Sequence, residues 1–534
     1  MKRFILLFIG IGLACISMWA QKADMDARKL QMALYAVKNL YVDPTDESKL
    51  VEDAITGMLE KLDPHSTYTD PEETKEMTEP LEGNFDGIGI QFNMLTDTVY
   101  VIQVIPGGPS EKVGLVAGDR IVQVNDTVIA GVKMKTSDIM KRLRGPKGSE
   151  VRVKVKRADE PDLLEFTITR GKIPVYSIDA SYMADKTTGY IKLNRFAASS
   201  ADEFREALRK LQKEGMKNLI LDLSGNGGGY LNIAIELADE FLTKGKLIVY
   251  TQGNKQRRQD AISTYQGNFE EGRLVILVDE SSASASEILS GAVQDWDRGV
   301  IVGRRTFGKG LVQRPLPLPD GSMIRLTVAR YYTPTGRCIQ KPYEKGKGMD
   351  YAHDLIDRYN RGELMSADSI HFPDSLKYNT MQSKRVVYGG GGIMPDVFIP
   401  IDTTDYSDYH RDLVSKGLVN RVAMDYLDQH RQALTKKYKK PQTYKEKFVV
   451  TDDIMAHLRQ LADEKGIAFK EEEYNRSLAL IKLQIKALIA RDLFDMTEYF
   501  YIINDVNDSY QEALKIINDE ERYNHVLDII SDIR

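Results

Sequence analysis

The chain has 534 residues, enough for about three or four domains of ordinary size. Apolar residues make up 42% of it, which is usual for globular domains. The formal net charge is only −5 and no long basic block occurs, which argues against nucleic acid as a main partner.

The first twenty residues differ from the rest of the chain. Lys2 and Arg3 precede an apolar run that ends before Ala20. This layout is typical of a secretory signal, so residues 1–20 predict an exported, periplasmic protein. Two alternatives stay open, a lipidated Cys15 and an uncleaved anchor, and both would associate the protein with a membrane. Cleavage after Ala20 would leave Cys338 as the remaining cysteine, so no intrachain disulfide is expected.

Residues 23–82 are predicted to form an N-terminal helical region. Apolar side chains recur there at helical spacing, at Leu30, Leu34, Val37, Leu40, Val51, Ile55, Met58 and Leu62. Two aspartate–proline pairs, at 63–64 and 70–71, predict breaks between the helices.

Residues 83–172 change to a period of two. Short alternating runs at 99–104, 151–156 and 164–169 are separated by glycine turns, and one short helix is expected near residues 137–143. This pattern predicts a small β-rich module.

Strands and helices then alternate through residues 173–402, as in an α/β core. Within this core, residues 342–385 are polar and are interpreted as an irregular insertion. Residues 403–534 are charged and patterned as helices. The expected fold class is therefore an α+β multidomain protein with a C-terminal helical domain.

Two segments of the core share one design, an apolar strand followed by a turn of small residues and a helix. In the first, residues 219–223 run into the glycine-rich turn 224–229; in the second, residues 274–278 run into the serine-rich turn 279–284. Unpaired N–H groups at a helix start favour negative charge, so two adjacent junctions would supply both donors of an oxyanion hole. The alternatives are a simple tight loop, a phosphate cradle, which would lack the usual Gly-Lys-Ser/Thr ending, and a serine that only caps its helix.

A nucleophilic serine at position 284 would need a base. None of the seven histidines lies between Ser66 and Ala352, which covers the β-rich module and most of the core. A lysine can replace histidine if its pKa falls through burial away from carboxylates. Lys309 fits because glycines flank it and no acid lies between Gly299 and Pro319. Gln313 could orient its amine; the alternative is a turn lysine directed to solvent.

These residues resemble a known family. Residues 282–288, Gly303, residues 306–310 and residues 312–313 are similar to the signature of the C-terminal processing peptidases, also called tail-specific proteases. The resemblance implies Ser284 as nucleophile, Lys309 as base and Gln313 as the residue that orients the base.

The resemblance also implies an oxyanion hole, formed by the amide of Ala285 and one from the glycine turn, Gly228 or Gly229. The turn departs from the family's usual pattern, because Ser224 stands where arginine is typical and Gly227 where proline is common. The backbone donors need no side chain, so this departure leaves them unaffected.

The β-rich module resembles a PDZ domain. Its carboxylate-binding loop would lie at Phe85, Gly87, Ile88, Gly89 and Ile90, where glycine N–H groups can bind a terminal carboxylate while the peptide adds a strand. The alternative is a PDZ fold that serves only as a spacer or lid.

The combined expectation is an exported serine endopeptidase that recognises and cleaves protein substrates near or from their C-terminal tails, with no metal or cofactor. The family resemblance also implies homodimer contacts through the helical regions. The alternative function is an inactive PDZ adaptor that captures exported tails.

Overall fold

The computed structural model describes residues 25–95, 97–157, 160–264 and 267–527. It divides into two compact units, one of Met1–Thr74, Gln313–Thr327 and Tyr343–His353, the other of Lys75–Val312, Val328–Pro342 and Asp354–Arg534. The predicted signal at residues 1–20 and Cys15 lie outside the described residues. In the part that is described, no helix is long and apolar enough to cross a membrane.

The first unit contains the N-terminal helices. Residues 25–40 are helical, and α2 (Glu47–Leu59) begins where the Asp46 carboxylate accepts the Lys49 N–H. A short strand, β1 (Thr67–Thr69), pairs antiparallel with the first residues of β18 (Met323–Tyr332). The Asp63 carboxylate joins these segments, since it accepts from the N–H groups of His65 and Ser66 and from the Thr327 hydroxyl. Asp63, predicted only as a helix breaker, thus also links these segments by hydrogen bonds. Helix α3 (Pro71–Glu82) leads into the second unit.

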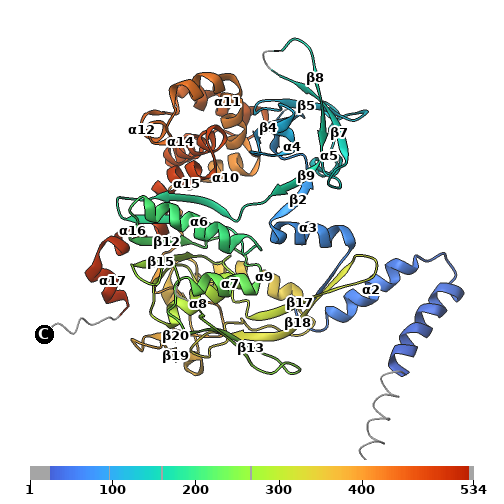
Figure 1. Cartoon of the computed structure of the whole chain (residues 1–534), viewed down its shortest axis with the longest axis vertical. Coiled ribbons are helices and arrows are strands. Elements are labelled where there is room, and N and C mark those ends of the chain that lie inside the picture. The colour runs from blue at the N-terminus through green and yellow to red at the C-terminus, as the bar shows by residue number, and fades with distance from the viewer. Residues whose placement is uncertain (1–24, 96, 158–159, 265–266, 528–534) are drawn as a thin grey trace, which may run out of the picture. The chain divides into compact units, whose positions relative to one another are not determined.

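A β-rich module follows in the second unit (Figure 1). Its sheet has the order β3-β4-β5-β7-β8, formed by Ile90–Met94, Val99–Val104, Arg120–Val124, Glu150–Lys156 and Leu164–Thr169, with β6 (Thr127–Val128) paired to β5. A ribbon of β2 (Asn84–Gly87) and β9 (Gly171–Pro174), with helices α4 (Pro109–Lys112) and α5 (Thr136–Leu143), completes the module. The inward residues of the alternating runs, such as Val99, Val101, Val151 and Val153, form its core.

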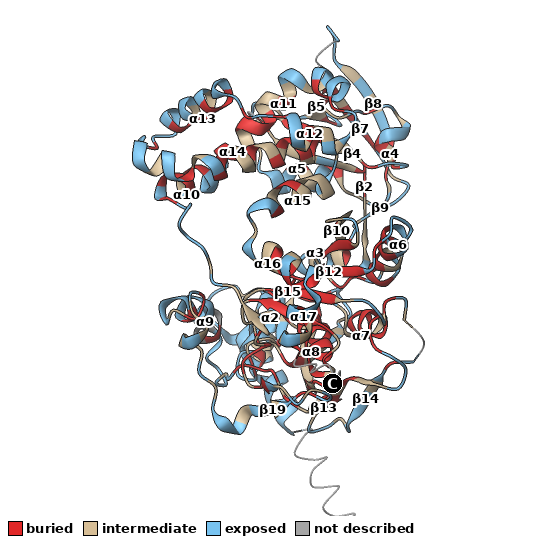
Figure 2. Ribbon diagram, turned by 90° about the vertical axis from the view of Figure 1, so that its left-hand side faces the viewer, coloured by how far each residue is buried: buried red, intermediate tan, exposed pale blue. Residues whose placement is uncertain are grey.

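The α/β core is built on a six-stranded sheet of order β10-β11-β12-β15-β16-β21. Its strands are Ile178–Met183, Thr188–Leu193, Asn218–Asp222, Leu274–Val278, Val300–Gly303 and Val397–Phe398. All neighbours are parallel except β10 and β11. β12 and β15 are buried along their whole lengths (Figure 2), and accordingly β15 is apolar throughout and β12 is apolar between its end residues Asn218 and Asp222.

Helices cover both faces of this sheet. Leu219 and Leu221 of β12 pack with α6 (Ser200–Lys213), α7 (Leu231–Asp239) and α8 (Ala285–Asp295). Ile220, which points to the opposite face, packs with α16 (Asp508–Asn518) and α17 (Glu520–Val526). The last helices of the chain thus complete the core that carries both strand–turn–helix junctions.

The remaining strands of the core lie outside the six-stranded sheet. They are β13 (Leu247–Gln252), β14 (Gln259–Ile262) and β17 (Leu311–Pro317). β13 pairs with β14 and with β18, and β17 also pairs with β18.

The segment 342–385 is more regular than expected. It contains α9 (Gly348–Asn360), and β19 (Lys377–Asn379) pairs with β20 (Val386–Tyr388) at its end. The expectation of irregular structure is wrong for α9, whose sequence shows no clear apolar face because the charged Arg358 is buried while Leu355, Ile356 and Tyr359 are exposed.

The C-terminal helices form a bundle with its own apolar core. They are α10 (Asp408–Ser415), α11 (Leu418–Lys437), α12 (Pro441–Lys447), α13 (Asp452–Glu464), α14 (Glu471–Leu493) and α15 (Met496–Ile503). The structure confirms the predicted fold class, an α+β multidomain protein with N-terminal helices, a β-rich module, an α/β core and C-terminal helices.

Candidate active site

Ser284 occupies the N-cap of α8, directly after the turn that follows β15. Its backbone has φ 57° and ψ −110°, a region that non-glycine residues rarely adopt. Such a conformation costs about 1–3 kcal/mol and is concentrated at functional sites. The Ser284 N–H donates to a Glu287 carboxylate oxygen at 2.8 Å, which holds the strained residue in place.

The glycine turn lies directly against Ser284. Gly228 has φ 101°, and a Cβ at this position would lie 2.9 Å from the Ser284 Cβ and 3.0 Å from the Ala285 nitrogen. Two further hydrogen bonds join the turns, since the Asn226 carbonyl oxygen accepts from the Ala283 N–H at 3.0 Å and from the Ser286 hydroxyl at 2.8 Å. The two junctions that the sequence singled out are therefore neighbours in the structure.

The predicted oxyanion donors differ in their surroundings. Ala285 is the first residue of α8, where helical N–H groups have no partner within the helix. The Gly228 N–H donates to the Asn226 side-chain oxygen at 2.9 Å, and the Asn226 amide donates to the Leu193 carbonyl at 2.9 Å. Gly229 packs against Phe196, whose carbonyl oxygen would lie 2.2 Å from an added Cβ. The roles of Ala285, Gly228 and Gly229 in an oxyanion hole stay predictions.

Glu287 connects the serine turn to the loop that carries Lys309. Its buried carboxyl group accepts from the Thr306 hydroxyl at 2.5 Å, the Gly308 N–H at 2.7 Å and the Lys309 N–H at 2.9 Å, besides the Ser284 N–H. Burial raises the pKa of Glu287 to about 7, although these hydrogen bonds oppose the rise. One side chain thus fixes the backbones of the predicted nucleophile and the predicted base.

Glu287 is not among the site residues predicted from the sequence. A signal for it was present, because a serine followed three residues later by glutamate at a helix start is a capping box. The pattern predicts the contact with Ser284 but not the three donors that arrive from residues 306–309.

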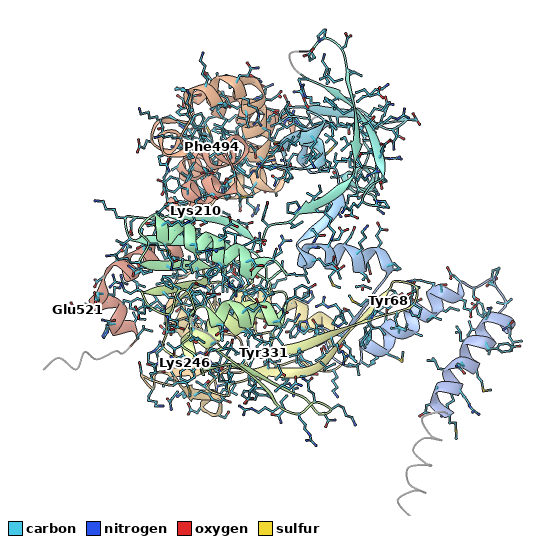
Figure 3. All side chains as sticks on the ribbon, in the orientation of Figure 1. Tyr68, Lys210, Lys246, Tyr331, Phe494 and Glu521 are labelled. Atoms are coloured by element: carbon cyan, nitrogen blue, oxygen red, sulfur yellow. The ribbon has the colours of Figure 1, made fainter. Side chains whose placement is uncertain are left out.

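Tyr331 of β18, labelled in Figure 3, makes a second connection between the two loops. Its hydroxyl donates to the Lys309 carbonyl oxygen and lies 3.1 Å from the Ser284 carbonyl oxygen. Gly310, which follows Lys309 in the chain, donates its N–H to the Gln340 side chain at 2.8 Å. Ser284 and Lys309 are both half-buried.

Gln313 lies on β17, four residues after Lys309 in the chain. Its amide nitrogen donates to the His65 carbonyl oxygen, and its amide oxygen accepts from the Arg325 guanidinium at 2.6 Å. Burial lowers the pKa of Arg325. The orientation of Lys309 by Gln313 stays a prediction.

The predicted carboxylate-binding loop joins β2 to β3. The Ile88 and Gly89 carbonyl oxygens accept from the N–H groups of Ser110 and Ile105, both at 3.0 Å, and Gly89 has φ 77°. The Arg144 guanidinium lies 4.6 Å from the centre of the Phe85 ring. Gly87 ends β2 and Ile90 begins β3. The role of these residues in peptide binding stays a prediction.

Family models match four segments of the chain. They are an activating protease CtpB N-terminal domain at residues 17–74, a PDZ domain at 87–168, peptidase family S41 at 187–350 and a family of unknown function at 409–495.

The chain is similar to a carboxy-terminal-processing protease of Bartonella bacilliformis. The two are 37% identical over 374 residues, which covers 69% of this chain and 83% of the relative. The chain is also 35% identical over 350 residues to the carboxy-terminal processing protease CtpB of Bacillus subtilis, which covers 64% of this chain and 70% of the relative. The chain belongs to the carboxy-terminal processing protease family.

Membership of this family identifies the β-rich module as a PDZ domain and the α/β core as a serine-type peptidase fold. Among solved structures, a photosystem II D1 C-terminal processing protease is 30% identical and covers 57% of this chain and 83% of its own, with a TM-score of 0.33. A TM-score this low transfers no geometry to the site.

In this processing protease, hydrogen bonds and an ion pair hold the glycine turn at Ser224, the position where arginine is usual in the family. Lys192 of β11 donates to the Ser224 carbonyl oxygen at 2.5 Å and lies 3.0 Å from the Asp222 carboxylate. Tyr190 donates to the same carboxylate at 2.6 Å. A cation from a neighbouring strand thus holds the start of the turn. In the described residues, no group of three or more His, Cys, Asp or Glu could hold a metal ion.

Proposed function

We propose that this processing protease is an exported serine endopeptidase that cleaves protein substrates near or from their C-terminal tails. In this proposal Ser284 is the nucleophile, Lys309 the general base and Gln313 the residue that orients the base. The main support is the geometry of one residue: Ser284 sits strained at a helix start against Gly228, and Glu287 binds both its N–H and that of Lys309.

The proposed reaction begins with a neutral Lys309 amine that accepts the Ser284 hydroxyl proton as the oxygen attacks a peptide carbonyl. The Ala285 N–H and an N–H of Gly228 or Gly229 stabilise the negative oxygen. The Lys309 ammonium then gives the proton to the leaving amine, and water hydrolyses the acyl-enzyme. Because the base must be neutral, activity is expected to rise toward alkaline pH.

The PDZ domain would supply tail recognition. A substrate's terminal carboxylate would bind the backbone N–H groups of the loop between Phe85 and Ile90, and its last residues would add a strand beside β3. The relatives' names, which refer to carboxy-terminal processing, support this substrate class.

In this proposal the protein is exported to the periplasm, because residues 1–20 have the layout of a secretory signal. A lipidated Cys15 or an uncleaved N-terminus would add a membrane attachment. The exposed apolar side chains of the N-terminal helices, among them Leu30, Met32, Tyr35 and Leu40, support a homodimer through these helices.

Fluorescently labelled casein tests the proposal. Native protein should cleave it, with a rate that rises with pH, while Ser284→Ala and Lys309→Ala should be inactive. A synthetic peptide with a free apolar C-terminus should bind all three proteins, and its C-terminal amide should bind none. If the native protein binds the peptide but cleaves no faster than Ser284→Ala, the protein is a tail-binding adaptor and the proposed activity is wrong.

A further inference from the structure

Helix α9, which is labelled in Figure 1, contacts the loop that carries Lys309, although it belongs to the segment interpreted from sequence as an insertion. Arg358, in the last turn of α9, is 1% exposed. Its guanidinium donates to the Thr306 carbonyl oxygen at 3.1 Å and to the Arg305 carbonyl oxygen at 2.7 Å. A planar guanidinium is suited to this task, because its donors are fixed relative to one another.

Arg358 makes closer contacts to these carbonyl groups than to a carboxylate. Its Nε lies 3.5 Å from the nearer Glu363 carboxylate oxygen, whereas Arg361 donates to Glu363 at 2.8 Å and Arg305 also pairs with it. Burial lowers the pKa of Arg358 to about 10, so the group stays protonated at neutral pH. Removing it would take this donor from both carbonyl groups, and the loss is costly because the contact to Thr306 is buried.

A second connection joins α9 to the same loop. The Lys341 N–H donates to the Gly308 carbonyl oxygen at 2.9 Å, and the Lys341 ammonium lies 4.0 Å from the centre of the Phe307 ring. That ammonium also pairs with Asp354 of α9 at 2.8 Å. The backbone from Arg305 to Gly308 is thus held by α9 through Arg358 and Lys341, while Glu287 binds the N–H groups of Gly308 and Lys309.

We propose that α9 positions the catalytic base, and that Arg358 is the positioning residue that does so. Arg358 touches neither the substrate nor the reacting atoms; it fixes the carbonyl groups of residues 305 and 306, and through them the backbone that leads to Lys309. This inference rests on the proposed function, because it requires Lys309 to be the base.

The test compares Arg358→Gln and Arg358→Lys with Arg361→Gln in the full chain. Arg361 is the matched control, because it binds the same Glu363 but has a half-exposed side chain. With labelled casein, and with rates expressed per folded molecule, kcat should fall ~10-fold or more in Arg358→Gln with little change in KM, since a displaced base slows chemistry more than binding. Arg358→Lys should lie between, because an ammonium cannot serve both carbonyls in the same geometry.

The pH profile separates positioning from simple loss of stability. A loosened loop admits water to the Lys309 amine and raises its pKa, so the acidic limb of the profile should move up by ~0.5 pH unit in both Arg358 variants and stay in place in Arg361→Gln. If Arg358→Gln does not fold, Arg358→Lys alone decides. Rates and profiles equal to those of Arg361→Gln would overturn this inference while the native enzyme remains active. A native protein no faster than Ser284→Ala would instead overturn the proposed function.

Discussion

The two strand–turn–helix junctions of the core have the same plan but carry it out differently. After β12, residues with positive φ are glycines, and the turn is held by the Asn226 side chain, which accepts from the Gly228 N–H. After β15, the residue with positive φ is Ser284. Its strained backbone is stabilised by the Glu287 carboxyl group, which accepts from the Ser284 N–H.

The difference shows that the glycine junction allows a close approach of backbone to the site, whereas the serine junction holds the proposed nucleophile. A glycine turn without strain lets backbone come close to a reacting group, whereas strain at a serine is maintained only where surrounding contacts enforce it. Four experiments would break or sharpen this contrast.

Replacing each of the two turn serines by alanine should give the largest difference in activity. Ser284→Ala should reduce casein cleavage by ~10³-fold or more, because no other hydroxyl can attack from this position. Ser224→Ala, in the matched glycine turn, should remain within a few-fold of native, since its contacts to Lys192 and Asp222 are made by its backbone. Initial rates of casein cleavage measure both, and equal losses would contradict the distinction.

A methyl group in the glycine turn should act next most strongly. Gly228→Ala should lower kcat by ~10²-fold, because the added Cβ would meet the Ala283 carbonyl oxygen at 2.8 Å and the Ser284 Cβ at 2.9 Å. Gly227→Ala is the control, since a Cβ there has no heavy atom within 4 Å. Steady-state kinetics compare the two. Similar kcat values for both variants would mean that the close approach at Gly228 has no catalytic importance.

Removing the negative charge that organises the serine junction should have a smaller effect. In Glu287→Gln the side-chain amide nitrogen cannot accept hydrogen bonds, so kcat should fall by ~10-fold. Glu236→Gln, on α7 at the other junction, is a control with a partly exposed side chain. Stopped-flow or steady-state assays at pH 8 would measure the ratio. A kcat for Glu287→Gln equal to that of Glu236→Gln would show that Glu287 only caps α8.

The last prediction is of a different kind and concerns stability against pH. Because burial raises the folded-state pKa of Glu287 from 4.5 to about 7, the folded protein retains a proton that the unfolded chain has lost. The resulting stabilisation, about 3 kcal/mol, is present below pH 4.5 and is lost as pH rises through 7. Between pH 5 and pH 8 the thermal midpoint should therefore fall more in native protein than in Glu287→Gln. Parallel changes would contradict the raised pKa.

Much of this site could be predicted from local patterns. The apolar strands, the turns of small residues and the helix periodicity identified both junctions, and the absence of histidine between Ser66 and Ala352 pointed to lysine as the base. These signals are local because each depends on the spacing of neighbouring residues.

The contacts that hold the site together could not be predicted in the same way. Glu287 binds residues 306–309, Tyr331 binds Lys309, and Arg358 binds residues 305 and 306, so each contact joins positions 19 or more residues apart. Such contacts depend on tertiary packing. A buried arginine in α9 even weakened the periodicity that would have predicted the helix itself.

The central claim is that Lys309 activates Ser284 for attack, and covalent labelling tests it most directly. Native protein treated with a fluorophosphonate should carry one adduct, found by peptide mass spectrometry at Ser284, with a labelling rate that rises with pH. Lys309→Ala should label at least ~10²-fold more slowly. Labelling of Lys309→Ala at the native rate, or an adduct at another residue only, would contradict the account.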